Sequence, residues 1–359
     1  ALAEAQGLMG LQGVWVDVDD TYTSKAFYDR MRAVVTREVE QAKGHTNILA
    51  FLVGNELFPA RVHEAGTDRV EAFLATAAQA VKETDRTRFV SYANWPIVSF
   101  LDHAMWDAVC FNVYPYEPPS VSHAFGFRGY VEYLKQHLAR ERPLIITEVG
   151  LSVAPGTKGK KIGYGGLTHD AQRTGLLGLW DDLFQAGAQG GVIFEWCDEW
   201  WKPGKVAGDA ATHEADDPEE WFGLLEFPSP TNLVGVPRPA YQALQSYNQA
   251  IVLRPVSGEP YQHEIPVTVY AEQAVARIRV RVDQGRWHEV KKLSGHWWKF
   301  MLPLHAQTKV GAHRVTIEAE DAKHRLLVRT VRSVQVGAST PLPTLSLTTD
   351  RTTYEVDGK

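Results

Sequence analysis

The chain has 359 residues and a formal net charge of −6 at pH 7. This length allows more than one domain, because single domains usually comprise about 100–200 residues. The negative charge offers no basic surface of the kind that nucleic acids bind, so we predict no nucleic-acid partner. No apolar run reaches the roughly 18 residues that a membrane-spanning helix needs, and we predict no span in these residues.

Strand-like and helix-like segments alternate through the first two thirds of the chain. The helix-like segments place apolar residues on one face, as in Phe27, Met31 and Val35. The strand-like segments are short apolar runs without helical period, which are typical of strands buried on both faces. They cover residues 13–19, 48–56, 88–92, 108–114, 143–150 and 191–196. This alternation predicts a parallel sheet covered by helices.

Two layouts of a parallel sheet compete. A doubly wound open sheet would carry a Gly-rich phosphate turn after an early strand, and the sequence contains none. Polar and aromatic residues instead gather where the predicted strands end, as in a TIM (β/α)₈ barrel, whose active site lies at that face. These residues are Asp17, Glu56, Asn94, Tyr114, Glu148 and Trp196. We therefore predict an α/β fold of the TIM-barrel type.

Two of these strand ends carry glutamates, Glu56 after Gly54-Asn55 and Glu148 after Thr147. A pair of carboxylates facing one cleft suits glycoside hydrolysis. One protonates the leaving oxygen, and the other attacks the anomeric carbon or activates water to do so. Asp198 and Glu199, which follow the last predicted strand, are the main alternatives for a carboxylate role. The 13 histidines show no paired ligand spacing, so we predict no metal and no other cofactor.

The ordered set of Asn55-Glu56, Tyr114, Glu148 and Trp196 resembles the clan A glycoside hydrolases, over about the first 250 residues. The resemblance implies a retaining β-glycosidase with Glu56 as acid/base and Glu148 as nucleophile. It also implies that Asn55 hydrogen-bonds the sugar 2-hydroxyl and that Tyr114 holds Glu148. Trp196 would form the floor under the reacting sugar. If Glu56 ends the fourth strand of that barrel, strands three to eight are visible and the first two are missing.

The remaining predicted substrate-binding residues are Asn94, Trp95, Asn112, Trp200 and Trp201. The Trp-rich segment after the last strand resembles the branches of that clan that act on β-glucans. We expect a hydrolase or transglycosylase acting on a β-linked glucan or oligosaccharide. A catalytically inactive carbohydrate-binding or scaffold protein with a barrel fold is the alternative. A lyase or isomerase would require a lysine, a metal site or a phosphate loop at strand ends, and none is evident.

The sequence pattern changes after Leu253, where apolar and polar residues begin to alternate as in half-buried strands. We predict a barrel over residues 1–253 and an accessory immunoglobulin-like β-sandwich over residues 258–337. Residues 338–359 are predicted to form a linker and the beginning of a further β domain. A glycosidase with such a domain is expected to be secreted or periplasmic. The sequence does not indicate an oligomeric state.

Overall fold

The computed structural model describes residues 2–17, 22–117, 121, 125–156, 163–199, 202, 213–227, 234–304 and 308–337. Structural statements below refer to these residues. The predicted sugar-binding Trp200 and Trp201, and the predicted tail after residue 337, lie outside them. The chain divides into two compact units, Ala1–Leu253 and Arg254–Lys359, and each is described by itself.

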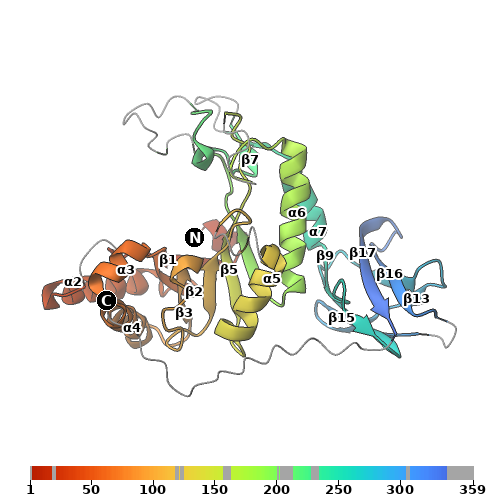
Figure 1. Cartoon of the computed structure of the whole chain (residues 1–359), viewed down its shortest axis with the longest axis horizontal. Coiled ribbons are helices and arrows are strands. Elements are labelled where there is room, and N and C mark those ends of the chain that lie inside the picture. The colour runs from red at the N-terminus through yellow and green to blue at the C-terminus, as the bar shows by residue number, and fades with distance from the viewer. Residues whose placement is uncertain are drawn as a thin grey trace, which may run out of the picture. The chain divides into compact units, whose positions relative to one another are not determined.

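The first unit is built on a six-stranded parallel sheet in which the strands follow one another in chain order (Figure 1). The strands are β1 (Gly10–Val14), β2 (Ile48–Asn55), β3 (Phe89–Asn94), β4 (Val109–Asn112), β5 (Leu144–Val149) and β6 (Gly190–Ile193). Parallel neighbours need a crossover between them, and helices supply most of it here. The predicted parallel sheet is confirmed, and all its strands end at the same edge.

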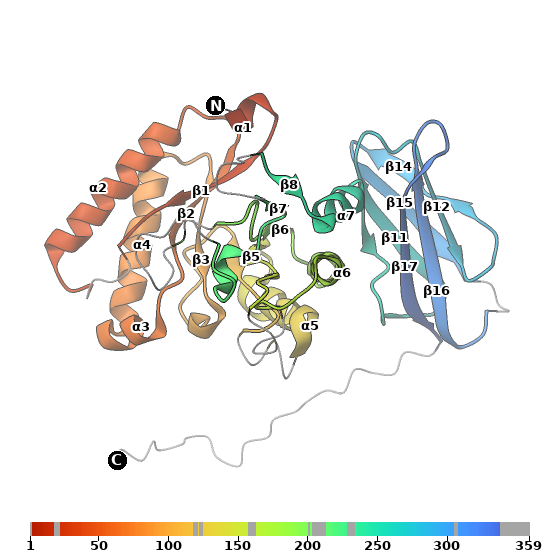
Figure 2. The ribbon, with the colours of Figure 1, turned by 90° about the horizontal axis from the view of Figure 1, so that it is seen from above.

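Helices cover the sheet, and Figure 2 shows α2 and α4 beside β1 to β3, with α5 and α6 beside β5. The helices are α1 (Leu2–Ala5), α2 (Lys25–Ala42), α3 (Pro59–Ala65), α4 (Thr67–Thr84), α5 (Gly126–Tyr133), α6 (His169–Gln185) and α7 (Pro239–Asn248). Short helical turns are η1 (Pro96–Val98), the π-helix η3 (Leu134–Ala139) and η4 (Pro218–Glu220). Among the described helices, none has both the length and the apolar character that a bilayer crossing requires.

The sequence predicts the α2 helix from its cap and its apolar stripe. Ser24 accepts a hydrogen bond from the Phe27 N–H at 3.1 Å, which satisfies one of the free donors of the first turn. The buried residues of α2 are Phe27, Met31, Val35 and Val39. Successive steps of four residues place them on the face that packs against the sheet and α4.

The first strand begins and ends earlier than the sequence pattern predicts. We expected residues 13–19, but β1 covers Gly10–Val14 and pairs with β2 from Gly10 opposite Ile48 to Val14 opposite Val53. The chain leaves the sheet at Trp15, which is 79% exposed, although Val16 still packs into the core. An apolar run therefore marked a strand correctly but not the point where strand pairing stops.

A long segment joins β6 to α7 and contains η4 and a small two-stranded sheet, β7 (Leu225–Glu226) with β8 (Val236–Pro237). Trp221 lies in this segment, where its ring stacks on His213 with centroids 3.8 Å apart. The Trp221 indole N–H donates to the Glu214 carbonyl at 2.8 Å. These contacts place Trp221 in the packing of the segment itself.

The second unit is all β, with alternate residues buried along its longer strands as the sequence predicts. One sheet has the order β10-β17-β16-β12-β13, and the other has the order β14-β15-β11-β9. The strands are β10 (Pro260–Tyr261), β11 (Glu264–Ala271), β12 (Arg277–Val282), β13 (His288–Glu289), β14 (Lys291–Ser294), β15 (Trp297–Pro303), β16 (Gly311–Glu320) and β17 (Leu326–Val336), and β9 (Ala250–Arg254) contains the boundary between the two units. The immunoglobulin-like assignment stays a prediction.

Candidate active site

The first predicted carboxylate follows directly after β2, which ends at Asn55. Gly54 has a φ of 90° and Glu56 a φ of 42°, so the chain leaves the sheet through left-handed conformations. A glutamate rarely adopts such a φ, and residues held in this way gather at functional sites. The Glu56 N–H donates to the Ala93 carbonyl of β3 at 3.0 Å. This bond anchors Glu56 at the C-terminal edge of the sheet.

Asn112, the last residue of β4, connects three strands at that edge. Its Nδ2 donates to Asn55 Oδ1 at 3.0 Å and to Glu56 Oε1 at 3.0 Å. Its Oδ1 accepts from the Thr147 hydroxyl of β5 at 2.7 Å. The Asn112 NH₂ group thus faces Asn55 and Glu56, and the Asn112 carbonyl oxygen faces Thr147.

The second predicted carboxylate, Glu148, lies in β5 opposite Asn112 in the strand register. The Tyr114 hydroxyl donates to Glu148 Oε2 at 2.8 Å, which is the contact that the resemblance implies. The Val113 N–H donates to the Glu148 carbonyl at 2.9 Å, so the backbone is held as well. The β4 strand and its exit thus provide one donor to each glutamate, Asn112 to Glu56 and Tyr114 to Glu148.

Burial raises the pKa of both carboxyl groups, and that of Glu148 reaches about 7. The Asn112 hydrogen bond opposes this rise at Glu56, and the Tyr114 hydrogen bond opposes it at Glu148. Negative charge on Glu56 raises the pKa of Glu148 further. The two carboxyl groups therefore interact electrostatically, and ionising one makes ionising the other less favourable.

Aromatic rings pack around Tyr114. Its ring stacks on Tyr116 with centroids 5.2 Å apart and meets Phe194 and Phe222 edge-on at 6.2 Å and 6.0 Å. Phe194 directly follows β6, and sequence analysis did not single it out because it reads as the end of a buried apolar run. These rings keep water from the hydrogen bond between Tyr114 and Glu148, and a low local dielectric strengthens that bond.

A hollow of about 320 Å³ reaches Glu148. Asn55, Thr147 and Glu148 line it together with Trp15 and Val192. Trp15 was not among the predicted site residues, although it follows β1 directly. An exposed indole beside a carboxylate offers a flat apolar face of the kind on which sugar rings stack.

The segment after β6 brings a positive charge to this region. The Lys202 ammonium lies 2.9 Å from a Glu199 oxygen, 3.5 Å from a Glu219 oxygen and 4.7 Å from the centre of the Phe194 ring. The charge of Glu219 raises the pKa of Glu148, and that of Lys202 lowers it. Neither Lys202 nor Glu219 could be found from strand ends, because both lie in the long segment between β6 and α7.

The two predicted residues at the end of β3 have different surroundings. Asn94 is 1% exposed, and neither polar atom of its side chain has a hydrogen-bond partner among the described residues. Trp95 packs partly buried against the core, with its ring 6.1 Å from that of Phe58. A role in substrate binding stays a prediction for both.

Trp196 does not share the contacts of the site aromatics described above. It is 61% exposed, and its ring meets Tyr241 of α7 edge-on at 5.8 Å. Phe194, two residues earlier, does contact Tyr114. The role of Trp196 as the floor under a sugar stays a prediction.

A known protein family matches most of the first unit. The family described as glycosyl hydrolases family 2, TIM barrel domain, matches residues 5–220. The chain belongs to glycosyl hydrolases family 2. Its fold in the first unit is accordingly that of a TIM-barrel domain, with six parallel strands described. A comparison with curated proteins found no match.

Solved structures of several glycosidases are similar to this chain. A Bacteroides uniformis β-glucuronidase 2, covalently bound to cyclophellitol-6-carboxylate aziridine, has 14% identity and a TM-score of 0.51 over 94% of this chain. This chain covers 40% of that structure, and at this identity the likeness shows the fold alone. A GH2 β-galacturonidase from Eisenbergiella tayi has 16% identity and a TM-score of 0.47, covering 68% of this chain and 41% of that one. An endo-β-1,4-mannanase from Thermotoga petrophila has 13% identity and a TM-score of 0.40, covering 89% of this chain and 74% of that one. These two lower scores add nothing to the conclusion about the fold.

Asp198, one of the alternative candidates for a carboxylate role, forms a buried ion pair. It is fully buried, and the Arg238 guanidinium donates to both of its oxygens at 2.8 Å and 2.5 Å. The Gly223 N–H donates to the same carboxylate at 2.9 Å. Nearby in sequence, Glu195 is buried with its Oε1 unpartnered among the described residues. Burial raises the pKa of Glu195 to about 9, so it is protonated at neutral pH.

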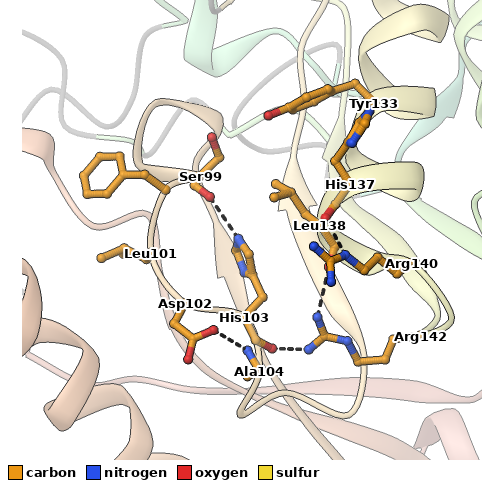
Figure 3. A pocket seen from close by; sticks show the side chains of 11 residues that line it. Ser99, Leu101, Asp102, His103, Ala104, Tyr133, His137, Leu138, Arg140 and Arg142 are labelled. Atoms are coloured by element: carbon orange, nitrogen blue, oxygen red, sulfur yellow. Dashed lines mark hydrogen bonds between the residues drawn. The ribbon is translucent and has the colours of Figure 1, made fainter. Parts of the chain in front are cut away.

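A second hollow, of about 450 Å³, lies between the segment after β3 and the η3 helix, and Figure 3 shows His103, Arg140 and Arg142 around it. The Arg142 guanidinium donates to the His103 carbonyl and, at 2.9 Å, to the Leu138 carbonyl, which ties the two walls together. None of the catalytic or substrate-binding candidates lines this hollow. No group of three or more side chains suited to hold a metal ion occurs in the described part of the chain.

Proposed function

We propose that this chain carries the catalytic barrel of a retaining β-glycosidase, with Glu148 as nucleophile and Glu56 as acid/base. The observation that supports this most directly is the hydrogen-bonded arrangement at the ends of β2, β4 and β5. It gives each glutamate its own donor, Asn112 for Glu56 and Tyr114 for Glu148. Two partly buried carboxyl groups, one of which raises the pKa of the other, suit the acid and the nucleophile of a double displacement at an anomeric carbon.

In the first step, a Glu148 oxygen attacks the anomeric carbon while the bond to the leaving oxygen breaks. Glu56 gives its proton to that oxygen, and the sugar becomes an ester of Glu148. In the second step, Glu56 takes a proton from water, and the water oxygen attacks the same carbon and releases Glu148. The two inversions give net retention. A sugar hydroxyl in place of water would give transglycosylation.

Individual contacts support this division of roles. Glu148 must be ionised to attack, and against the burial that raises its pKa to about 7, the Tyr114 hydroxyl and the Lys202 charge both favour its ionised form. Glu56 must be protonated at the start, and burial and the neighbouring negative charges of Glu219 and Glu117 favour its protonated form. Because the two negative charges repel each other, the favoured state is the one in which the pair carries a single proton.

As substrate we propose a β-linked glucan or oligosaccharide, in a secreted or periplasmic setting. The aromatic rings beside the carboxylates, Trp15 and the group around Tyr114, support a carbohydrate ligand.

The test is covalent trapping of the intermediate. Full-length protein is treated with a 2-deoxy-2-fluoro β-glycoside that has a good leaving group, digested, and analysed by mass spectrometry. We expect the label on the peptide that contains Glu148, and none in the Glu148→Ala variant. Products of a normal substrate should keep the β configuration by NMR. A label elsewhere, or inverted products, would contradict the mechanism, and folded protein with neither label nor turnover would favour the scaffold alternative.

A further inference from the structure

The outer face of the five-stranded sheet in the second unit contains a hollow of about 280 Å³ over β12, β16 and β17, which lie side by side (Figure 2). Arg281 of β12 is opposite Thr316 of β16, which is opposite Val331 of β17. Arg314 and Arg329 each lie two residues along from these positions. Residues two apart on a strand share one face. Two short side chains are thus surrounded by three long cationic ones.

The charges of these arginines are only partly neutralised. Arg329 pairs with Glu318 at 2.6 Å, and Glu318 also pairs with Arg279 at 2.8 Å. Arg281 and Arg314 have no carboxylate partner for their guanidinium groups within the described residues, and Arg281 Nε is buried without any hydrogen-bond partner there. The hollow is therefore locally positive on a chain whose net charge is −6.

The one acidic residue that lines the hollow, Asp283, is already engaged. One oxygen of its carboxylate accepts from the Arg314 N–H at 2.9 Å, and the other faces His313 Nδ1 at 2.7 Å. Asp283 therefore holds the backbone of β16 and a histidine instead of a guanidinium group. This leaves the fork-like donors of Arg281 and Arg314 for another acceptor.

Arg281 is also held in place before any ligand arrives. Its guanidinium carbon lies 4.5 Å from the centre of the Trp287 ring, and that of Arg279 lies 4.8 Å from the same ring. Stacking on an indole restricts a planar guanidinium while leaving its N–H groups free to donate. Less side-chain freedom is then lost when an anion binds.

We propose that this hollow binds an oxyanion carried by an acidic polysaccharide. Guanidinium groups match the geometry of carboxylates and sulfates through paired N–H donors, and the Thr316 hydroxyl adds a further donor. The choice of a polysaccharide rests on the proposed function, because a polymer held here would lie on the same chain as a glycosidase barrel. Uronate carboxylates and sulfate esters present the same chemistry, so the experiment must separate them.

The full chain is titrated with hexagalacturonate, with a sulfated oligosaccharide of equal length and with a neutral β-gluco-oligosaccharide, and binding is measured by calorimetry. We expect one or both of the acidic oligosaccharides to bind, with an affinity that falls as salt is added. Arg281→Ala with Arg314→Ala should weaken that binding at least tenfold. Arg277→Ala is the matched control, because Arg277 lies on the same strand but pairs with Glu289 and Glu320, and it should change the affinity less than twofold.

A second variant guards against misfolding. Arg281→Lys with Arg314→Lys keeps both charges but removes the paired donors, so it should bind with intermediate affinity and an unchanged circular dichroism spectrum. Binding of one acidic oligosaccharide but not the other supports the site and shows whether it takes a carboxylate or a sulfate ester. Absence of binding by both, equal binding by all variants, or tighter binding of a single-stranded oligonucleotide would overturn the proposal.

The Glu148→Ala variant separates this inference from the proposed function. It should bind the acidic oligosaccharide as tightly as the unmodified chain, because Glu148 lies in the other unit. If covalent trapping fails while this binding persists, the proposed catalytic function is wrong and the anion site stands. If trapping succeeds without binding, the opposite holds.

Discussion

At the scale of single residues, Tyr114 combines two functions that a phenylalanine could only half replace. Its ring is packed among Tyr116, Phe194 and Phe222, and its hydroxyl donates to Glu148. Burial raises the pKa of the Tyr114 hydroxyl itself far above neutrality, so it remains a donor at every working pH. The ionised form of Glu148 therefore always has this hydrogen bond available.

Replacing Tyr114 with Phe should move the acid limb of kcat/KM to higher pH. Glu148 must be ionised to react, its pKa is already raised to about 7, and losing a donor to the ionised form raises that pKa again. A hydrogen bond to a charged group contributes about 1.5–3 kcal/mol, which corresponds to a shift of roughly 1–2 pH units. Tyr247→Phe, which removes a hydroxyl bonded to Asp181 on α6, is the control. An acid limb that stays in place would show that Tyr114 does not act on the nucleophile.

Asn94 leads to a prediction about stability. A buried amide without hydrogen-bond partners costs about 1–3 kcal/mol relative to a satisfied one. Asn94→Leu should therefore raise the free energy of unfolding or leave it unchanged, measured by urea denaturation. Asn112→Leu should lower it, because three hydrogen bonds are lost. If Asn94→Leu unfolds as easily as Asn112→Leu, the Asn94 amide has a structural partner.

Sequence reasoning could place the residues at strand ends and little else of the site. Asn55, Glu56, Asn112 and Glu148 come together because parallel strands end at one edge, and the apolar runs before them mark those strands. Lys202 is set by a long irregular segment whose path no periodicity encodes. The catalytic roles stay predictions, whereas the proximity of these side chains is a feature of the structure.

At the scale of elements, β6 and the segment after it are fixed by close backbone contacts. A Cβ on Gly150, just after β5, would lie 2.1 Å from the Phe194 carbonyl, so only glycine lets the two chains approach this closely. A few residues later, the Asp198 and Arg238 pair joins the exit of β6 to the residue before α7. The position of Phe194 against Tyr114 depends on both.

Asp198→Asn should be among the most destabilising single changes in the first unit. It leaves the buried Arg238 charge without its carboxylate, and breaking a buried ion pair in this way costs about 3–5 kcal/mol. Asp170→Asn removes an exposed ion pair with Arg173 and should leave stability unchanged within error. Chemical denaturation of the two variants makes the comparison, and equal effects would show that the Asp198 pair contributes no more than a surface pair.

At the scale of the whole molecule, the chain holds two units, each with its own buried residues. The strand and helix alternation predicts the first and the change of period predicts the second, because each fold class buries its residues with a different spacing. Two further strands of a closed barrel and an immunoglobulin-like topology are finer features, and both stay predictions. A one-dimensional pattern gives the type of each element but not how the sheet is completed around it.

Each unit should unfold in a calorimetric transition of its own. Val280→Ala removes buried methyl groups from the second unit and should lower only one transition, by about 4–8 °C for each kcal/mol lost. Val81→Ala, at an equally buried site in α4, should lower only the other. A single transition that both variants shift together would mean that the units unfold as one.

The hydrogen bonds around Asn112 also have a direction. The Thr147 hydroxyl donates to the Asn112 carbonyl oxygen, and the Asn112 amide donates to the Asn55 carbonyl oxygen. The Asn55 oxygen accepts this bond, and the Asn55 NH₂ group stays available as a donor for whatever enters the site. The site therefore favours an acceptor atom at that point. A threonine on β5 thus influences, through two amides, the chemical character of the atom preferred next to β2.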